Sequence, residues 1–164
     1  MHFVNPSPGV TVLVESEEGV LLCRRSDYAG FGGLWCLPGG HIDYNEDFLT
    51  AGLREVQEET GVQVEITALL SVVSTFWEHG DSILAAVLLA SPIGGEPRPD
   101  NHETTDAGWF RPNSLPELAF EADAHIIERY FATRVVGAPV DPNYVRLAQP
   151  GAAPVPPPAS RHSR

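Results

Sequence analysis

Residues 40–62 have the sequence GHIDYNEDFLTAGLREVQEETGV, and this stretch decides the fold and the chemistry expected of the chain. Its pattern predicts a helix over residues 45–60. Asn45 suits the position that caps a helix N-terminus, and the acidic residues after it favour the positive end of the helix dipole. Gly61 suits the left-handed residue that ends a helix. The stretch therefore predicts a turn followed by one amphipathic helix.

Three glutamates, Glu55, Glu58 and Glu59, have the i, i+3, i+4 spacing that places side chains on one helix face. Apolar residues on a different face are expected to pack on the core, namely Leu49, Leu53 and Val56. Neighbouring carboxylates repel one another, and Arg54 alone cannot balance three of them. A hard divalent cation can, because carboxylate oxygens suit magnesium or manganese. The alternative is a solvated acidic helix face.

A glycine-rich turn precedes the predicted helix. A short strand, residues 34–37, is expected to stop at Pro38-Gly39-Gly40. Glycine has no Cβ, so backbone carbonyls at such a turn can approach a ligand or a metal closely. This setting favours a functional acidic cluster over a solvated helix face.

The combined pattern resembles the Nudix box. Gly40 is followed after five residues by Glu46, and after seven more by the run Arg54-Glu55-Val56-Gln57-Glu58-Glu59-Thr60-Gly61-Val62, without a departure from the motif. The resemblance extends more loosely over residues 10–135. It implies a Nudix hydrolase, which is an α/β/α sandwich around a mixed sheet. Such enzymes use magnesium, or sometimes manganese, to cleave a pyrophosphate bond in a nucleoside diphosphate linked to another moiety.

The resemblance also implies roles for individual residues of the box. Glu58 and Glu59 match the principal metal ligands, and Glu55 matches a further ligand or the general base. Gly39 and Gly40 match the turn that can add a backbone carbonyl. These assignments agree with the chemistry, because a diphosphate resists attack by water until metal ions withdraw its charge.

The remaining catalytic roles fall partly outside the metal ligands. Glu46 and Arg54 match positions that orient the carboxylates. Some members of the family use a glutamate on a later loop as the general base, and here Glu103 is the candidate, with Asp106 as the alternative. The base therefore stays open between Glu55 and these loop residues.

Substrate-binding residues are expected close to the box. Nucleobases are commonly held by stacking, so Phe31 in a glycine-rich loop and Trp77 at a strand end are candidates. Arg25 ends a strand near that loop and can bind a phosphate.

Three functions stay open at this point. The run HETTDAGWF is similar to members that hydrolyse ADP-ribose or related nucleoside diphosphate sugars, which is the favoured substrate class. The short segment before the box suits a MutT-type enzyme that hydrolyses nucleoside triphosphates. The third is a nucleotide-binding sensor domain without activity. Such a domain is expected to have lost a carboxylate of the box, and all of them are present here.

The rest of the chain predicts a mixed α/β domain. A second helix is expected over residues 120–135, and strands over residues 10–15, 20–25, 62–76, 82–92 and 107–112. This order is not a regular βαβ alternation, so a mixed sheet between helices is expected. Residues 1–136 form the predicted Nudix domain. Residues 137–164 hold seven of the fifteen prolines and are predicted to form a disordered tail.

Composition narrows the function further. The 164 residues include ten arginines, no lysine and 22 acidic residues, for a formal net charge of −12. Such a surface repels nucleic acid and anionic lipid, and the lack of lysine excludes Schiff-base and P-loop chemistry. Two cysteines without a secretion signal predict free thiols in a cytoplasmic protein. A small nucleotide is the expected partner, and the family resemblance adds a homodimer as an expectation.

Overall fold

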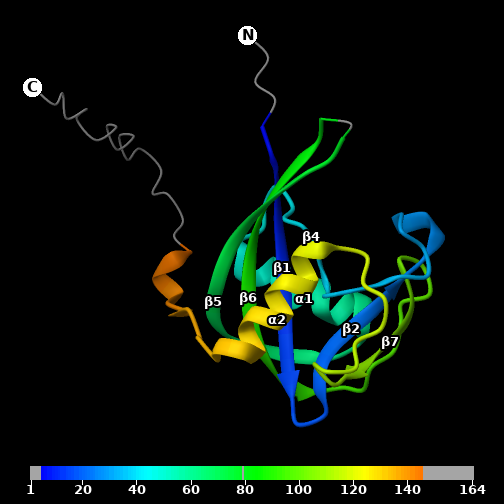
Figure 1. The fold of residues 1–164 in the computed structure, drawn as a ribbon. Helices are drawn as coiled ribbons and strands as arrows, with labels where there is room; N and C mark the ends of the chain where they lie inside the picture. The colour runs from blue at the N-terminus through cyan, green and yellow to red at the C-terminus, as the bar shows by residue number, and fades with distance from the viewer. Residues whose placement is uncertain (1–4, 79, 146–164) are drawn as a thin grey trace, which may run out of the picture.

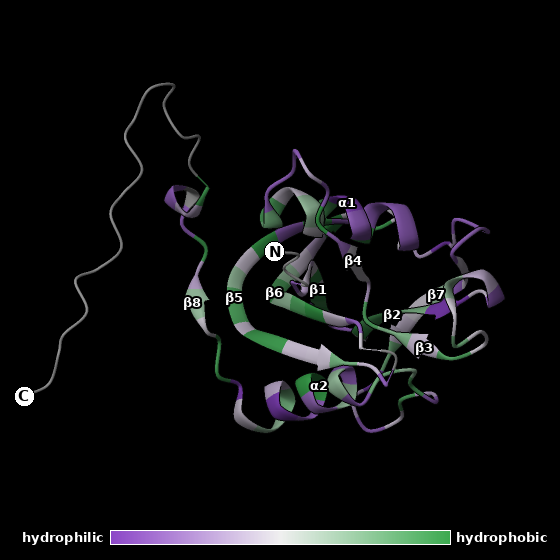
Figure 2. Cartoon of the chain, turned by 90° about the horizontal axis from the view of Figure 1, so that it is seen from above, coloured by the Kyte–Doolittle hydropathy of each residue, from purple (hydrophilic) through white to green (hydrophobic). Residues whose placement is uncertain are grey.

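A mixed β-sheet between two helices forms the protein, as the computed structural model of residues 5–78 and 80–145 shows (Figures 1 and 2). The helices are α1 (Phe48–Thr60) and α2 (Glu121–Thr133). The strands are β1 (Ser7–Ser16), β2 (Gly19–Arg25), β3 (Trp35–Cys36), β4 (Gly39–His41), β5 (Gln63–Phe76), β6 (Ser82–Gly94), β7 (Thr104–Phe110) and β8 (Ala138–Pro139). The predicted α/β/α sandwich is confirmed.

Strand β1 is the strand on which the sheet is built. It pairs in parallel with β6 over residues 7–14, and its other edge pairs antiparallel with β4 at residues 9–11 and with β2 at residues 15–16. The strand order is β3-β2-β1-β6-β5-β8, with β4 added beside β1 and β7 beside β2. Strand β4, which holds Gly39 and Gly40, precedes α1 in the chain, and its pairing with β1 places Gly40 next to Glu55 of α1.

The sheet buries apolar residues on both faces, one face under each helix (Figure 2). Alternate residues of β1 separate the two layers: Val12 and Val14 face α1, whereas Leu13 faces α2. Strand β6 alternates in the same way, with Leu88 under α1 and Leu89 under α2. This two-sided burial explains the near-continuous apolar runs of these strands.

Helix α1 begins later than expected, and Asn45 does not cap it. The cap is Asp47, whose carboxylate accepts hydrogen bonds from the N–H groups of Leu49 and Thr50, each at 2.9 Å, and from the Thr50 hydroxyl at 2.7 Å. The prediction was wrong because the chain makes a turn before the helix, in which the Glu46 N–H donates to the Asp43 carbonyl at 3.0 Å, and Asp47 then caps α1. Gly61 ends the helix in the left-handed conformation, as predicted.

Two further expectations about this region need correction. Leu53 is 43% exposed, because α1 presents Gly52 and Val56 to the sheet instead. A Cβ on Gly52 would lie 2.8 Å from Leu88 Cδ1, so this glycine lets the helix approach closely. Gly39 and Gly40 do not end a strand. They form β4 and pair with Thr11 and Val10 of β1.

The segment predicted as a tail is described up to residue 145. Within it, Ala138–Pro139 form β8 and pair with Leu69 and Ala68 of β5. Residues 146–164 lie outside the described residues, so the domain boundary at residue 136 stays a prediction. Neither α1 nor α2, at 13 residues each, is long and apolar enough to cross a membrane in the part of the chain described here.

Replacing the helix cap tests the corrected start of α1. Asp47→Ala removes three accepted hydrogen bonds and is expected to lower the free energy of unfolding by about 1 to 2 kcal/mol in urea denaturation. Asn45→Ala is the matched control, because Asn45 is exposed and precedes the cap. An equal or larger loss for Asn45→Ala would contradict this assignment.

Candidate active site

The guanidinium of Arg54 gathers the acidic side chains of the box. Its Nε and Nη2 donate to the two carboxylate oxygens of Glu46, each at 2.8 Å. Its Nη1 donates to Glu55 Oε1 at 2.8 Å and to Glu58 Oε2 at 3.3 Å, while Nη2 also donates to the carbonyl of His41 at 3.0 Å. One side chain therefore ties the turn before α1 to two glutamates on it, and the predicted orienting pair is found in contact.

Glu55 is held in a buried position beside Gly40 of β4. It is 7% exposed, and a Cβ on Gly40 would lie 2.5 Å from Glu55 Oε1, so a larger residue at position 40 would displace the carboxylate from this position. Burial raises the pKa of Glu55, the contact with Arg54 lowers it in part, and the negative charges of Glu58 and Glu103 raise it again. Arg54 therefore balances the negative charge around the Glu55 carboxylate only in part.

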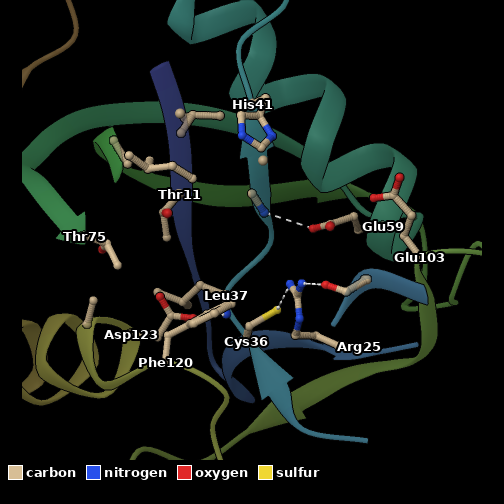
Figure 3. A pocket seen from close by; sticks show the side chains of 18 of the residues that line it. Thr11, Arg25, Cys36, Leu37, His41, Glu59, Thr75, Glu103, Phe120 and Asp123 are labelled. Carbon is tan, nitrogen blue, oxygen red and sulfur yellow. Dashed lines mark hydrogen bonds between the residues drawn. The ribbon is translucent and has the colours of Figure 1, made fainter. Parts of the chain in front are cut away.

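Glu59, one helical turn later, is 6% exposed and lies at the cavity wall (Figure 3). Its Oε2 accepts from the Gly39 N–H at 2.9 Å and from the Cys23 thiol at 3.7 Å. No cation forms an ion pair with it among residues 5–78 and 80–145. Burial and nearby negative charges, including Glu55 and Glu103, raise the pKa of Glu59 well above its usual range.

Glu58, unlike Glu55 and Glu59, points toward solvent. Its side chain is 58% exposed and touches only the edge of the Arg54 cluster. The three glutamates that the helical spacing groups together are therefore divided by the packing into two buried carboxylates and one exposed carboxylate.

Glu103 approaches the same region from the loop before β7. The Ser26 N–H donates to the Glu103 carbonyl at 2.8 Å, and the Thr104 hydroxyl donates to the Glu59 carbonyl at 2.9 Å. The Asp100 carboxylate also accepts from the Glu103 N–H, which fixes the loop. Glu103 lines the cavity and lies close enough to raise the pKa of Glu55 and Glu59.

A cavity of about 410 Å³ opens between the sheet and α2, next to Glu59 and Glu103 (Figure 3). Its lining includes sheet residues such as Thr11 and Thr75, and the first turn of α2 with Phe120 and Asp123. Asp106, the alternative to Glu103, does not line it, because its side chain accepts from its neighbour Ala107 on β7. The cavity is large enough for a small organic ligand.

Two of the three residues predicted to bind substrate line this cavity. They are Arg25 and Trp77. The Arg25 guanidinium donates to the carbonyls of Ala29 and Gly30 and lies 5.0 Å from the Phe120 ring centre, so it also anchors the loop above the cavity. Phe31 does not line the cavity. Its exposed ring makes an edge contact with Phe120, at 5.5 Å between ring centres.

Sequence reasoning missed Asp123 as a lining residue. It is 5% exposed on α2, and its carboxylate accepts from the Leu37 N–H at 2.9 Å. Burial raises the pKa of Asp123 to about 6, against the lowering effect of the Leu37 N–H and of Arg25. Nothing in the helical pattern separates this aspartate from the exposed acids on the same helix; its contact with Leu37, directly after β3, does.

No three acidic, histidine or cysteine side chains of the described residues already converge on one point as a metal site would. The donors themselves nevertheless suit a hard cation, because they are carboxylate and carbonyl oxygens. Glu55, Glu59 and Glu103 also concentrate negative charge that Arg54 balances only in part.

The ionisation of Asp123 is expected to make stability depend on pH. Folding raises its pKa from 3.8 to about 6. Below about pH 4 the carboxyl is protonated in both states and does not lower the free energy of unfolding. Above about pH 6 the folded protein bears the full cost of burying the charged carboxylate. Asp123→Asn should therefore gain up to about 3 kcal/mol in the free energy of unfolding, relative to wild type, between pH 4 and pH 7. Glu121→Gln, an exposed acid on the same turn, is the control in urea titrations. Parallel curves for wild type and Asp123→Asn would contradict the prediction.

Comparison with known proteins places this arrangement in a family. Residues 5–130 match the family model of the NUDIX domain. The chain is 31% identical over 129 residues to an ADP-ribose pyrophosphatase of Methanocaldococcus jannaschii, covering 78% of this chain and 75% of that protein. It is 36% identical over 119 residues to a MutT-like protein of Streptomyces ambofaciens, covering 72% of each.

The crystal structure of a MutT NUDIX hydrolase from Burkholderia pseudomallei has the same fold. It superposes with a TM-score of 0.69 at 32% identity, covering 76% of this chain and 98% of that one. The family match includes β1 to β7, all of α1 with its glutamates, and most of α2. The chain therefore belongs to the NUDIX family of hydrolases.

Proposed function

We propose that this NUDIX hydrolase cleaves the pyrophosphate bond of ADP-ribose or of a related nucleoside diphosphate sugar. The observation that carries the reaction is the pair of buried carboxylates on α1, Glu55 beside Gly40 of β4 and Glu59 at the wall of the cavity of about 410 Å³. Similarity to an ADP-ribose pyrophosphatase over three quarters of that protein supports the substrate class.

The small number of positively charged side chains at the cavity also favours a diphosphate substrate over a triphosphate. Arg25 is the one arginine among the described lining residues, and two loop carbonyls already accept hydrogen bonds from it. A triphosphate carries more negative charge than a diphosphate and needs more compensation. The MutT-type reaction on nucleoside triphosphates is the second candidate, because the chain is 36% identical to a MutT-like protein.

Magnesium, or alternatively manganese, is the proposed cofactor. Glu58 and Glu59 would hold it, together with Glu55 and the carbonyls of Gly39 and Gly40. When bound, the cation supplies charge neutralisation on the diphosphate and activates water at neutral pH. The buried, poorly compensated charge of Glu55 and Glu59 supports this assignment. Glu58 is exposed and has no ion-pair partner besides Arg54 in the described chain, so its carboxylate can reorient toward a ligand.

Glu103 is the proposed general base. It lines the cavity, whereas Glu55 does not, and Glu55 Oε1 already accepts a hydrogen bond from Arg54. Glu103 would take the proton from the attacking water, and Arg54, held by Glu46, would keep Glu55 in place. This division gives each carboxylate a separate task.

The substrate would enter between the sheet and α2. Trp77 offers a stacking surface, and Arg25 and Phe31 would shape the loop above the cavity, where Arg25 can also reach a phosphate. Cytoplasmic location and a homodimer stay predictions from composition and from the family resemblance.

Product analysis distinguishes the two substrate classes. With magnesium and then manganese, the enzyme is expected to release AMP and ribose 5-phosphate from ADP-ribose faster than it cleaves any triphosphate, as resolved by chromatography. Other nucleoside diphosphate sugars, dinucleoside polyphosphates, canonical triphosphates and 8-oxo-dGTP complete the panel. A monophosphate plus pyrophosphate as the dominant products would establish the MutT-type reaction instead. Inactivity on every compound would favour a nucleotide-binding domain.

Substitution of the proposed ligands tests the metal site. Glu58→Gln and Glu59→Gln keep the side-chain shape, remove one charge each, and are expected to lower turnover by more than about tenfold. Their affinity for magnesium in calorimetric titration should fall in parallel. Glu65→Gln is the control, because Glu65 is exposed on β5 away from the cavity. Near-normal turnover and magnesium affinity would remove the substituted residue from the ligand set.

The general base is tested by the same approach. Glu103→Gln should lower turnover more than Glu55→Gln at saturating magnesium, because Glu103 lines the cavity and Glu55 does not. The reverse order would assign the base to Glu55.

A further inference from the structure

We propose that Cys23 and Cys36 form a reversible disulfide, a covalent modification site joined to the candidate active site. The two thiols lie directly opposite each other on the antiparallel strands β2 and β3, with the sulfur atoms 3.7 Å apart. They are the only two cysteines of the chain, so an intramolecular disulfide can have only this pairing. The bond itself does not depend on the proposed function; its effect on activity does.

The distances favour closure of this bond. Residues directly opposite on antiparallel strands have Cα atoms about 4.5 to 5.5 Å apart, which lies inside the range that disulfides span. The sulfur atoms need to approach from 3.7 Å to about 2.05 Å. Strand β3 has only two residues, so the approach involves a short segment of the sheet, which Leu37 and Pro38 join by hydrogen bonds to Asp123 and Val12.

The cavity gives an oxidant access to the pair. Cys23 is fully buried, whereas Cys36, though only 3% exposed, lies at the cavity wall, with its sulfur 3.9 Å from Arg25 Nη1 (Figure 3). A guanidinium beside a thiol favours the reactive thiolate. Cys36 is therefore the thiol that reacts first, and Cys23 is the one that resolves the product.

Hydrogen peroxide is the co-reactant in the proposed reaction. The Cys36 thiolate attacks one peroxide oxygen, the O–O bond breaks, and the leaving hydroxide takes a proton to give water and a Cys36 sulfenic acid. The Cys23 sulfur then attacks the Cys36 sulfur. The S–O bond breaks, and the hydroxyl leaves with the Cys23 proton as a second water. Two thiols are oxidised, one peroxide is reduced, and a dithiol such as dithiothreitol reverses the change.

The modification would act on Glu59. Glu59 Oε2 accepts from the Cys23 thiol and from the Gly39 N–H, and the disulfide removes the thiol donor. It also draws Cys36 away from Arg25, which anchors the loop over the cavity through the carbonyls of Ala29 and Gly30. Loss of such a supporting contact to a metal-site carboxylate lowers activity by about tenfold or more.

Peroxide treatment of the full chain tests the proposal. Intact-mass measurement is expected to show the loss of two hydrogen atoms, peptide mapping to join the peptides of Cys23 and Cys36, and hydrolysis to fall by about tenfold. Dithiothreitol should restore both mass and activity. Cys36→Ser is the matched control and should show neither change relative to its own untreated value, whereas Cys23→Ser should gain one oxygen atom on Cys36 without a crosslink.

Each outcome has a separate meaning. Two thiols that stay open to alkylation after peroxide treatment, or a disulfide between two chains, would overturn the proposal. A disulfide that forms without changing hydrolysis would overturn its link to the active site. If the untreated protein hydrolyses none of the tested compounds, the proposed function fails, and magnesium affinity before and after oxidation becomes the readout of the link to Glu59.

Discussion

The fork of hydrogen bonds from Arg54 is the interaction on which the acidic site depends. It binds Glu46 through two N–H groups and Glu55 through a third, and it reaches the His41 carbonyl as well. Without this cation, the carboxylates of α1 would repel one another next to a buried strand. The same contact ties Glu46, in the turn before the helix, to the side of α1, which begins at Phe48 after the Asp47 cap.

Close packing of backbone around the carboxylates is the second constraint. Gly40 leaves room for the Glu55 carboxylate, and the Gly39 N–H donates a hydrogen bond to Glu59. Both glycines are held in place by the pairing of β4 with β1. A sheet strand at this position is stiffer than a turn, so the two carboxylates are held against a fixed wall. Their burial raises the pKa of both carboxyl groups, and little positive charge lies near them. A divalent cation would supply that positive charge.

The cysteine pair shows how the two layers of the site are connected. Cys23 contacts Glu59, and Cys36 lies at the cavity wall beside Arg25, so the two thiols connect the buried carboxylate to the loop that Arg25 holds. Sequence composition predicted free thiols, and both are free here. Their juxtaposition depends on the pairing of β2 with β3, which no local pattern indicates.

The sequence alone determined the family, the acidic helix with its closing Gly61, and the mixed sheet between two helices, because motif spacing and apolar periodicity are local properties of the chain. It could not determine the division of Glu55, Glu58 and Glu59 into buried and exposed carboxylates, the exposure of Leu53, or the place of Asp123 in the cavity. These depend on how α1 and α2 are rotated against the sheet, and on contacts between residues distant in sequence, such as Leu37 with Asp123. Burial and pKa follow from that packing, so only the tertiary structure decided them.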